Sequence, residues 1–179
     1  MILSPKSDQG LAIYVDADFA GNWDPKETQD RDTARSRHGY IAMYAGCPIM
    51  WKSQLQGEIT LSSTESEYTG MSYALRDGIP LMHMLREFAK HGLLVGDTTP
   101  TIHCEVFEDN SGALEIATNH KYRPRTKHLN VKLHHFRDYV TQKEILIKSI
   151  GTLEQPADYL TQAVNEPILR KHRMFLQGW

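Results

Sequence analysis

Four acidic residues stand near the ends or the beginnings of the regular elements that the sequence suggests. They are Asp16, Glu67, Asp109 and Asp158. Hydrolysis of a phosphodiester by two metal ions needs several carboxylates at one point, because two hard cations about 4 Å apart bind oxygen ligands, activate a water and stabilise the leaving oxygen. No single acid carries this hypothesis alone, but acids at a strand, a helix, a strand end and a helix start are more specific together.

Asp16 lies in an apolar segment, residues 11–19, that is typical of a β-strand ending in acids. An acid inside an apolar strand costs free energy unless it is paired or bound to a metal. Asp18 points to the same face two residues later and could share the site. The alternative is that the strand simply ends here and that both acids are solvated.

Glu67 lies in a segment that begins at Ser62 or Ser63, either of which is a good helix N-cap. On a helix, Glu67 stands at the edge of an apolar stripe, which aims it toward the sheet. Glu65 falls on the polar side of the same helix, so we expect an exposed acid of the first turn that the helix dipole favours.

Asp109 directly follows an apolar strand and precedes a helix, and Asp158 stands in a first helical turn opened by Pro156. The end of a strand is where α/β proteins place their chemistry. The alternatives are a plain N-cap for Asp109 and compensation of the helix dipole for Asp158. Taken alone, the position of Asp158 favours the second explanation.

The elements that must position these acids alternate between strands and helices. Strands are predicted at residues 11–19, 39–45, 47–51, 101–107 and 144–150. Helices are predicted from Ser62 or Ser63 to a break at Gly78 and Pro80, from there to Lys90, from Ser111 to Ala117, from Leu129 to Val140, from Pro156, and from Pro167 to Leu176. The order indicates an α/β domain with a five-stranded mixed sheet, which combines an antiparallel meander and parallel strands, with helices on both faces.

The length of 179 residues and a hydrophobic content of 40% suit one domain with a real core. We expect an N-terminal extension at residues 1–10, the domain itself at 11–162 and a C-terminal helical tail at 163–179. The cysteines, Cys47 and Cys104, exclude a disulfide scaffold and fit buried thiols in a reducing compartment. No signal peptide or apolar run of membrane-spanning length is present, so we expect a soluble intracellular protein.

Charge is divided between two parts of a nearly neutral chain, whose net charge is −2. Residues 16–32 are rich in acids, and residues 119–137 contain no acid but many bases. This division suggests a metal site beside a surface that binds phosphates, although charge alone favours two solvated faces. The candidates for contact with nucleic acid are Lys121, Tyr122, Arg123, Arg125, Lys127 and His128.

Other residues favour simpler explanations. His134 and His135 lie near His128 and could suggest a metal, but a basic helix without cysteine favours histidines at the surface or on phosphates. Trp23, Trp51 and the methionines are most simply residues of the core.

A series of motifs resembles the ribonuclease H region of copia-type LTR retrotransposon Pol polyproteins. The motifs are YVDADFAG at 14–21, WKSQLQ at 51–56, LSSTESEY at 61–68, EDNSGA at 108–113, RTKHL at 125–129 and QPADYLT at 155–161. They occur in the order of the family and cover the chain from about Leu11 to Gln162, so their specificity together is high.

The resemblance implies a ribonuclease H-like fold and hydrolysis of the RNA strand of RNA–DNA hybrids, leaving 5′-phosphate ends, during reverse transcription. It maps the catalytic and metal-binding carboxylates onto Asp16, Glu67, Asp109 and Asp158. It also implies two Mg²⁺ ions with Mn²⁺ as a substitute, an RNA–DNA hybrid and the reverse transcriptase of the same polyprotein as partners, no membrane, and cytoplasmic virus-like particles as the location.

Two departures and two alternatives accompany the resemblance. Many cellular and retroviral relatives carry a histidine in the loop before the last acid, and residues 151–156 contain none. Gln162 replaces a usual lysine, which we expect to be a minor surface change.

One alternative is a catalytically weak or inactive scaffold that binds hybrid beside a reverse transcriptase. The other is a DNA-cutting nuclease of the same broad fold.

Overall fold

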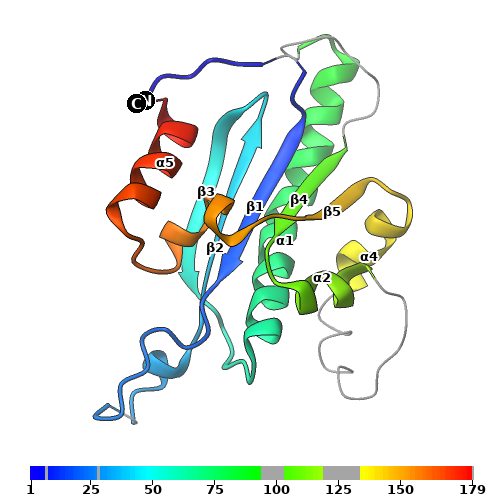
Figure 1. Cartoon of the computed structure of the whole chain (residues 1–179). Coiled ribbons are helices and arrows are strands. Elements are labelled where there is room, and N and C mark those ends of the chain that lie inside the picture. Colours follow the sequence, from blue (N-terminus) through cyan, green and yellow to red (C-terminus); the bar gives the residue numbers. More distant parts are fainter. Residues whose placement is uncertain (7, 28, 94–102, 119–133, 179) are drawn as a thin grey trace.

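The protein forms one mixed five-stranded sheet with helices on both faces (Figure 1). The computed structural model describes residues 1–178 except 7, 28, 94–102 and 119–133. The strands are β1 (Leu11–Ala17), β2 (Arg37–Tyr44), β3 (Cys47–Leu55), β4 (Cys104–Glu108) and β5 (Ile145–Ser149), in the order β3-β2-β1-β4-β5. The first three pair antiparallel, and β4 is parallel to both β1 and β5. The predicted fold class is therefore confirmed.

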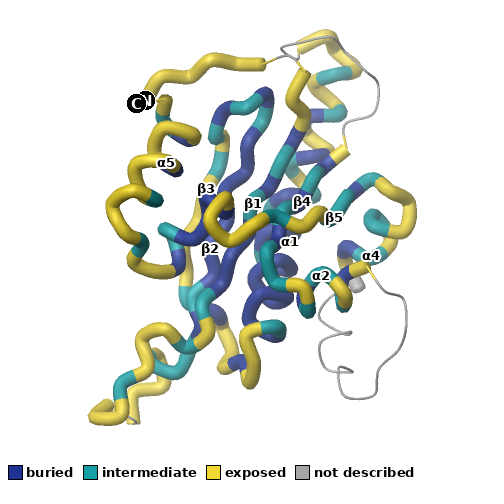
Figure 2. Tube along the Cα trace, in the orientation of Figure 1, coloured by how far each residue is buried: buried dark blue, intermediate teal, exposed yellow. Residues whose placement is uncertain are grey.

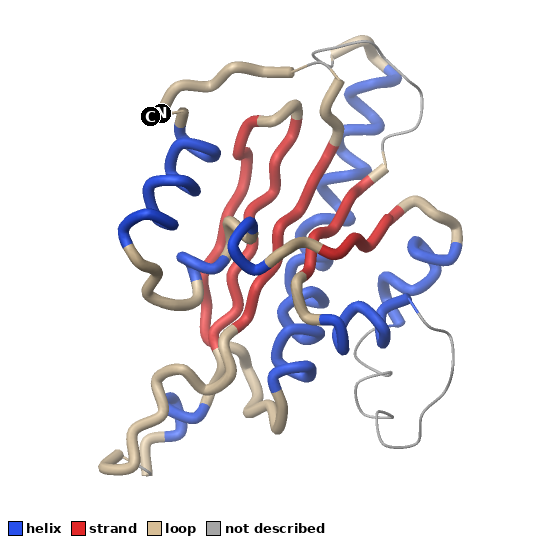
Figure 3. Tube along the Cα trace, in the orientation of Figure 1, coloured by secondary structure: helices blue, strands red, loops and turns tan. Residues whose placement is uncertain are grey.

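The main core lies between the sheet and α1 (Ser63–Lys90), with α2 (Ser111–Thr118) and α4 (His134–Thr141) beside it. Alternate residues of β1, among them Ile13 and Val15, point to this face and are fully buried. Figure 2 shows that the buried residues gather along the central strands and along much of α1, and Figure 3 shows the same view coloured by secondary structure.

A smaller cluster covers the opposite face of the sheet. There α5 (Glu166–Gln177) places Leu176 against Ile41 and Met43 of β2. Asn165 caps this helix by accepting from the backbone N–H of Ile168, and a proline stands in its first turn. The chain end returns to the start of the protein, because the N–H of Ile2 donates to the carbonyl of Gln177 (2.8 Å).

The predicted break at Gly78 and Pro80 is wrong, since α1 continues through both residues to Lys90. Pro80 lies on the exposed side of the helix, where water can serve the carbonyl that lacks its partner, and the buried Met82 and Leu85 hold the following turns against the core. Gly78 has a packing role instead, because a Cβ there would lie 2.4 Å from Cδ1 of Ile13.

The helix predicted from Pro156 is also wrong, since only a short 3-10 turn, η4 (Asp158–Leu160), forms there, after a second turn, η3 (Thr152–Glu154). The segment is tied to the sheet by Gln155, whose fully buried side chain donates to the carbonyls of Val15 (2.8 Å) and Phe107 (3.3 Å). This attachment replaces helical hydrogen bonding.

Several residues predicted for the core lie at the surface. Trp23 and Trp51 are 55% and 59% exposed, and Met1, Met84 and Met174 are exposed as well. Trp51 is exposed because β3 is an edge strand that the packed helices only partly cover. Met43, Met71 and Met82 are buried as predicted, and so are the free thiols of Cys47 and Cys104.

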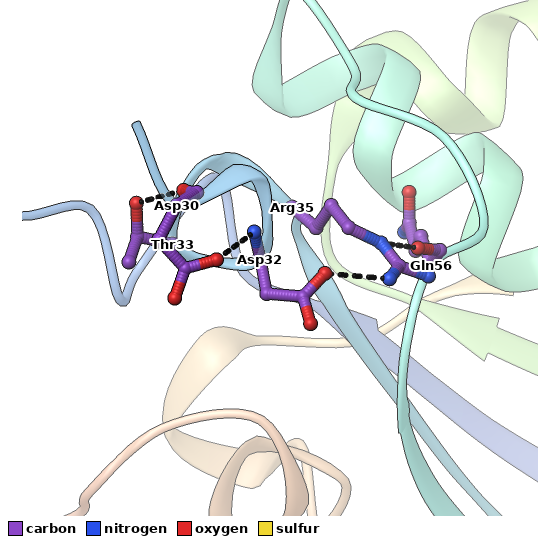
Figure 4. A network of polar contacts seen from close by, with 5 residues as sticks. All are labelled: Asp30, Asp32, Thr33, Arg35 and Gln56. Carbon is purple, nitrogen blue, oxygen red and sulfur yellow. Dashed lines mark hydrogen bonds and ion pairs between the residues drawn. The ribbon is translucent and has the colours of Figure 1, made fainter. Parts of the chain in front are cut away.

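The acid-rich segment before β2 is organised by local contacts around a short 3-10 helix, η1 (Arg31–Ala34) (Figure 4). Asp30 accepts from the backbone of Asp32, and Asp32 forms an ion pair with Arg35 at 2.8 Å. Arg35 also donates to the carbonyl of Gln56, which joins this loop to the segment before α1. These acids therefore act as caps and ion-pair partners.

Among the described helices, none is both long and apolar enough to cross a membrane.

Candidate active site

Three of the predicted carboxylates meet at one end of the sheet. One oxygen from each of Asp16, Glu67 and Asp109 can be chosen so that all lie within 4.8 Å of one another. Asp16 and Glu67 are 5% and 7% exposed, whereas Asp109 is only half-buried. The arrangement offers hard oxygen ligands from three separate elements to one ion.

The backbone explains why these three residues meet. β1 and β4 are parallel neighbours in which Tyr14 pairs with Phe107, so Asp16 and Asp109 leave the same edge of the sheet. Glu67 approaches because α1 crosses the end of β1 closely at Gly70, where an added Cβ would lie 3.3 Å from the Cβ of Ala17. The sheet register and one glycine therefore assemble the cluster.

Asp158 lies in the same cleft but outside the group of three. It opens η4 and is 6% exposed. The absence of a side chain at Gly39 lets this segment lie on β2, since a Cβ there would be 2.7 Å from Leu160. Thr161, which follows η4, donates its hydroxyl to Oδ2 of Asp16 and lies 2.9 Å from the carbonyl oxygen of Asp158.

Burial and mutual repulsion raise the pKa values of several carboxylates in this cluster. Burial, and then Asp109 and Asp18, raise the pKa of Asp16 to about 6, against the hydrogen bond from Thr161, which lowers it. Burial, and then Asp16 and Asp109, raise the pKa of Asp158 to about 7. The pKa of Glu67 is raised strongly, by burial first and then by neighbouring carboxylates. A cation would relieve this repulsion.

A second observation indicates that these oxygen donors fit a divalent metal ion. Oε2 of Glu67 and Oδ1 of Asp158 are buried oxygens with no hydrogen-bond partner among the described residues. Buried polar atoms are nearly always satisfied, so such oxygens call for a ligand. Asp16, Glu67, Asp109 and Asp158 are the residues that could hold it.

Sequence reasoning missed Glu108, a fifth carboxylate behind the cluster. It is fully buried, its Oε1 accepts from the backbone N–H of Asn110 (3.1 Å), and its Oε2 has no partner within the described ranges. Its pKa is raised, first by burial. The signal was present, because Cys104, Val106 and Glu108 alternate on the inward face, but the strand was expected to end at Phe107.

Two other acids, Asp18 and Glu65, accept hydrogen bonds from the backbone. Asp18 lines the cleft, but its Oδ1 accepts from the backbone N–H of Arg37 (2.6 Å), and it lies outside the group of three. The prediction that Glu65 is exposed is wrong, since it is 8% exposed. Its carboxylate reaches back to accept from the N–H of Leu61 (2.9 Å), while Ser62 caps the helix by accepting from the N–H of Glu65.

The carboxylates line an open cleft of about 790 Å³. Other residues that line it include Phe19, Arg37, Ser53 and Tyr159. The predicted nucleic-acid contacts Lys121, Tyr122, Arg123, Arg125, Lys127 and His128 all lie outside the described residues. Of the paired histidines, His135 is exposed and packs edge-on to Phe136.

No model of a known protein family matches the chain. The chain is 34% identical over 158 residues to the retrovirus-related Pol polyprotein from transposon TNT 1-94 of Nicotiana tabacum, covering 88% of the chain and 11% of the polyprotein. It is 30% identical over 155 residues to that from transposon RE1 of Arabidopsis thaliana, covering 87% and 10%. The chain thus spans about a tenth of the length of these relatives.

Among solved structures, the N-terminal RNase H domain of a Mycobacterium tuberculosis protein superposes with a TM-score of 0.55 at 16% identity, covering 94% of this chain and 99% of that one. The fold is therefore that of the ribonuclease H-like proteins. The chain matches one segment of the copia-type retrotransposon Pol polyproteins, so the resemblance drawn from its motifs is confirmed.

Proposed function

We propose that this chain is a metal-dependent ribonuclease H that cuts the RNA strand of RNA–DNA hybrids during retrotransposon reverse transcription. The observation that carries the proposal is the convergence of Asp16, Glu67 and Asp109, with ligand oxygens within 4.8 Å, in an open cleft that Asp158 also lines. The fold and the relationship to Pol polyproteins support the same activity.

In this proposal Asp16, Glu67, Asp109 and Asp158 hold two Mg²⁺ ions, for which Mn²⁺ can substitute. When bound, such ions would supply an activated water and stabilise the leaving 3′ oxygen, so the products would carry 5′-phosphate and 3′-hydroxyl ends. Thr161 orients the carboxylate of Asp16 by its hydrogen bond, as partners of metal ligands commonly do.

Residues outside the carboxylate cluster would act by position. Gln155 holds the segment that bears Asp158 against β1 and β4, so that this acid faces the other three. The basic segment with Lys121, Tyr122, Arg123, Arg125, Lys127 and His128 would bind phosphates of the hybrid, which gives affinity without reading sequence. The reverse transcriptase of the same polyprotein would be the physical partner.

The test is cleavage of a hybrid with 5′-labelled RNA in Mg²⁺ or Mn²⁺, with duplex RNA and duplex DNA as controls. The wild type should cut only the RNA of the hybrid, and Asp109→Asn should lose cutting. Cyclic phosphate ends would exclude this mechanism. A folded wild type that binds hybrid without cutting it would indicate a scaffold, and cutting of duplex DNA would indicate a different nuclease.

A further inference from the structure

The acidic cleft contains one cation positioned to meet a phosphate. Among the described residues that line it, five are carboxylates and one, Arg37, is basic. A nucleic-acid strand entering this cleft would be repelled by the carboxylates that lack a bound metal. A fixed positive charge at the wall would offset that repulsion and define where the strand lies.

Arg37 lies near the row of the sheet that contains Asp16. The sheet register aligns Ser53, Gly39 and Asp16 in one row across three strands, because Gly39 pairs with both of the others. Arg37 lies two residues before Gly39 on the same face of β2, which is about 6.6 Å along the strand. Arg37 therefore follows this row on the same face of the sheet, and its guanidinium reaches Ser53 of the row.

The guanidinium is oriented by hydrogen bonding. Its Nη1 donates to the hydroxyl of Ser53 (3.2 Å), and that hydroxyl donates in turn to the carbonyl of Leu160 in η4 (2.5 Å). Because the hydroxyl proton of Ser53 is directed to Leu160, its lone pairs are left to accept from Arg37. The same chain of bonds connects Arg37 to the turn that bears Asp158.

Most of the donors of Arg37 remain available. A guanidinium has several N–H donors in a planar fork suited to phosphate, and the contact with Ser53 uses one of them. Within the described part of the chain, Arg37 forms no ion pair. Burial raises the pKa of Asp18, and the backbone N–H of Arg37, which donates to that carboxylate, and the charge of Arg37 both oppose this rise. Arginine is suited to such a contact because its fork is rigid and always charged.

We propose that Arg37, held by Ser53, binds the phosphate adjacent to the scissile one on the RNA strand, and so places the scissile phosphate over the carboxylates. Arg37 is then a substrate-positioning residue. This inference rests on the proposed ribonuclease H activity. It concerns a contact on β2, separate from the predicted basic segment.

The first experiment compares Arg37→Gln, Arg37→Lys and Ser53→Ala with Arg170→Gln, which removes an exposed arginine from α5. Arg37→Gln should raise the KM for hybrid about 10-fold or more, the loss expected for one charged contact, and reduce the salt slope of binding by about one. Arg37→Lys and Ser53→Ala should give smaller increases in KM. Arg170→Gln should resemble the wild type.

The second experiment locates the phosphate. A single uncharged methylphosphonate is placed at each linkage of the hybrid in turn, and its effect on binding is measured for the wild type and for Arg37→Gln. At the RNA linkage next to the cut, the analogue should weaken binding by the wild type and have no further effect on the variant. Equal effects on both proteins at every linkage, or coupling only on the DNA strand, would overturn the inference.

The two proposals can fail separately. Hybrid cleavage by the wild type with no change in KM or salt slope in Arg37→Gln would remove only the role of Arg37. Absence of both hybrid binding and cleavage in the wild type would contradict the proposed function itself.

Discussion

The hydroxyl of Thr161 donates a hydrogen bond to Oδ2 of Asp16 and joins the end of β1 to the turn that bears Asp158, across 145 positions of sequence. The bond favours the ionised form of Asp16 and opposes the rise that burial causes in its pKa. It therefore both orients a carboxylate of the cluster and keeps it available as a ligand.

Removing this hydroxyl should impair catalysis without removing a carboxylate. We expect Thr161→Val to lower kcat about 10- to 100-fold, as loss of a partner of a metal ligand commonly does, and Thr161→Ser to retain most activity. The pKa of Asp16 should rise in Thr161→Val, so the acidic limb of the pH–rate profile should move to higher pH. A wild-type profile in the valine variant would show that the hydroxyl has no such role.

The crowded carboxylates should make the metal-free protein less stable as pH rises. Asp16 has a pKa of about 6 when folded, above its usual 3.8, so the folded state binds more protons between these values and its stability falls across this range. Relative to the wild type, Asp16→Asn should gain about 1–2 kcal/mol between pH 4 and pH 7. Urea unfolding in EDTA at both pH values measures this difference.

Addition of Mg²⁺ provides the companion measurement. The wild type should be stabilised, by about 2.7 kcal/mol at a concentration 100 times the Kd, and Asp16→Asn should respond much less. An equal response of both proteins would place the bound ion elsewhere.

The effect of His38 on the stability of the protein should have a pH dependence opposite to that of Asp16. The side chain of His38 is buried and stacks on Tyr73, with 4.5 Å between the ring centroids. Its ring nitrogens have no hydrogen-bond partner among the described residues. Burial first, and then the charge of Lys52, lower its pKa to about 4. The unfolded chain therefore binds more protons between pH 6.5 and pH 4, and the wild type loses stability as pH falls through this range.

His38→Phe should remove this loss while keeping the stacked ring. The variant should gain about 1–2 kcal/mol over the wild type between pH 8 and pH 5, measured by urea unfolding at each pH. A constant difference between the two proteins across this range would mean that His38 is charged or hydrogen-bonded in the folded state.

Gly78 should tolerate no side chain, despite lying inside a helix where alanine is normally preferred. A Cβ at this position would lie 2.4 Å from Cδ1 of Ile13, so Gly78→Ala should destabilise the protein by about 1–3 kcal/mol. Gly151→Ala is the matched control, since its Cβ would meet nothing within 4 Å. Ile13→Val removes the clashing methyl and should rescue Gly78→Ala, and failure of this rescue would contradict the packing explanation.

Much of the fold could be predicted because local patterns agree with it. Apolar segments indicated the strands, and Ser62 caps α1 where the sequence predicted a helix cap. The continuity of α1 could not be predicted, because the effect of Pro80 depends on which side of the helix faces the core. The exposure of Trp51 likewise depends on β3 being an edge strand, which the order of the elements alone does not decide.

The sequence by itself determined the family resemblance and the carboxylates that could form a site, because motifs and residue types are local properties of the chain. Only the tertiary structure decided which oxygens meet. The parallel pairing of β1 with β4 brings Asp16 to Asp109, and the close packing at Gly39 brings the segment of Asp158 to β2. The structure also placed Arg37 among the residues that line the cleft. These relationships depend on register and packing across distant segments, and no local pattern encodes them.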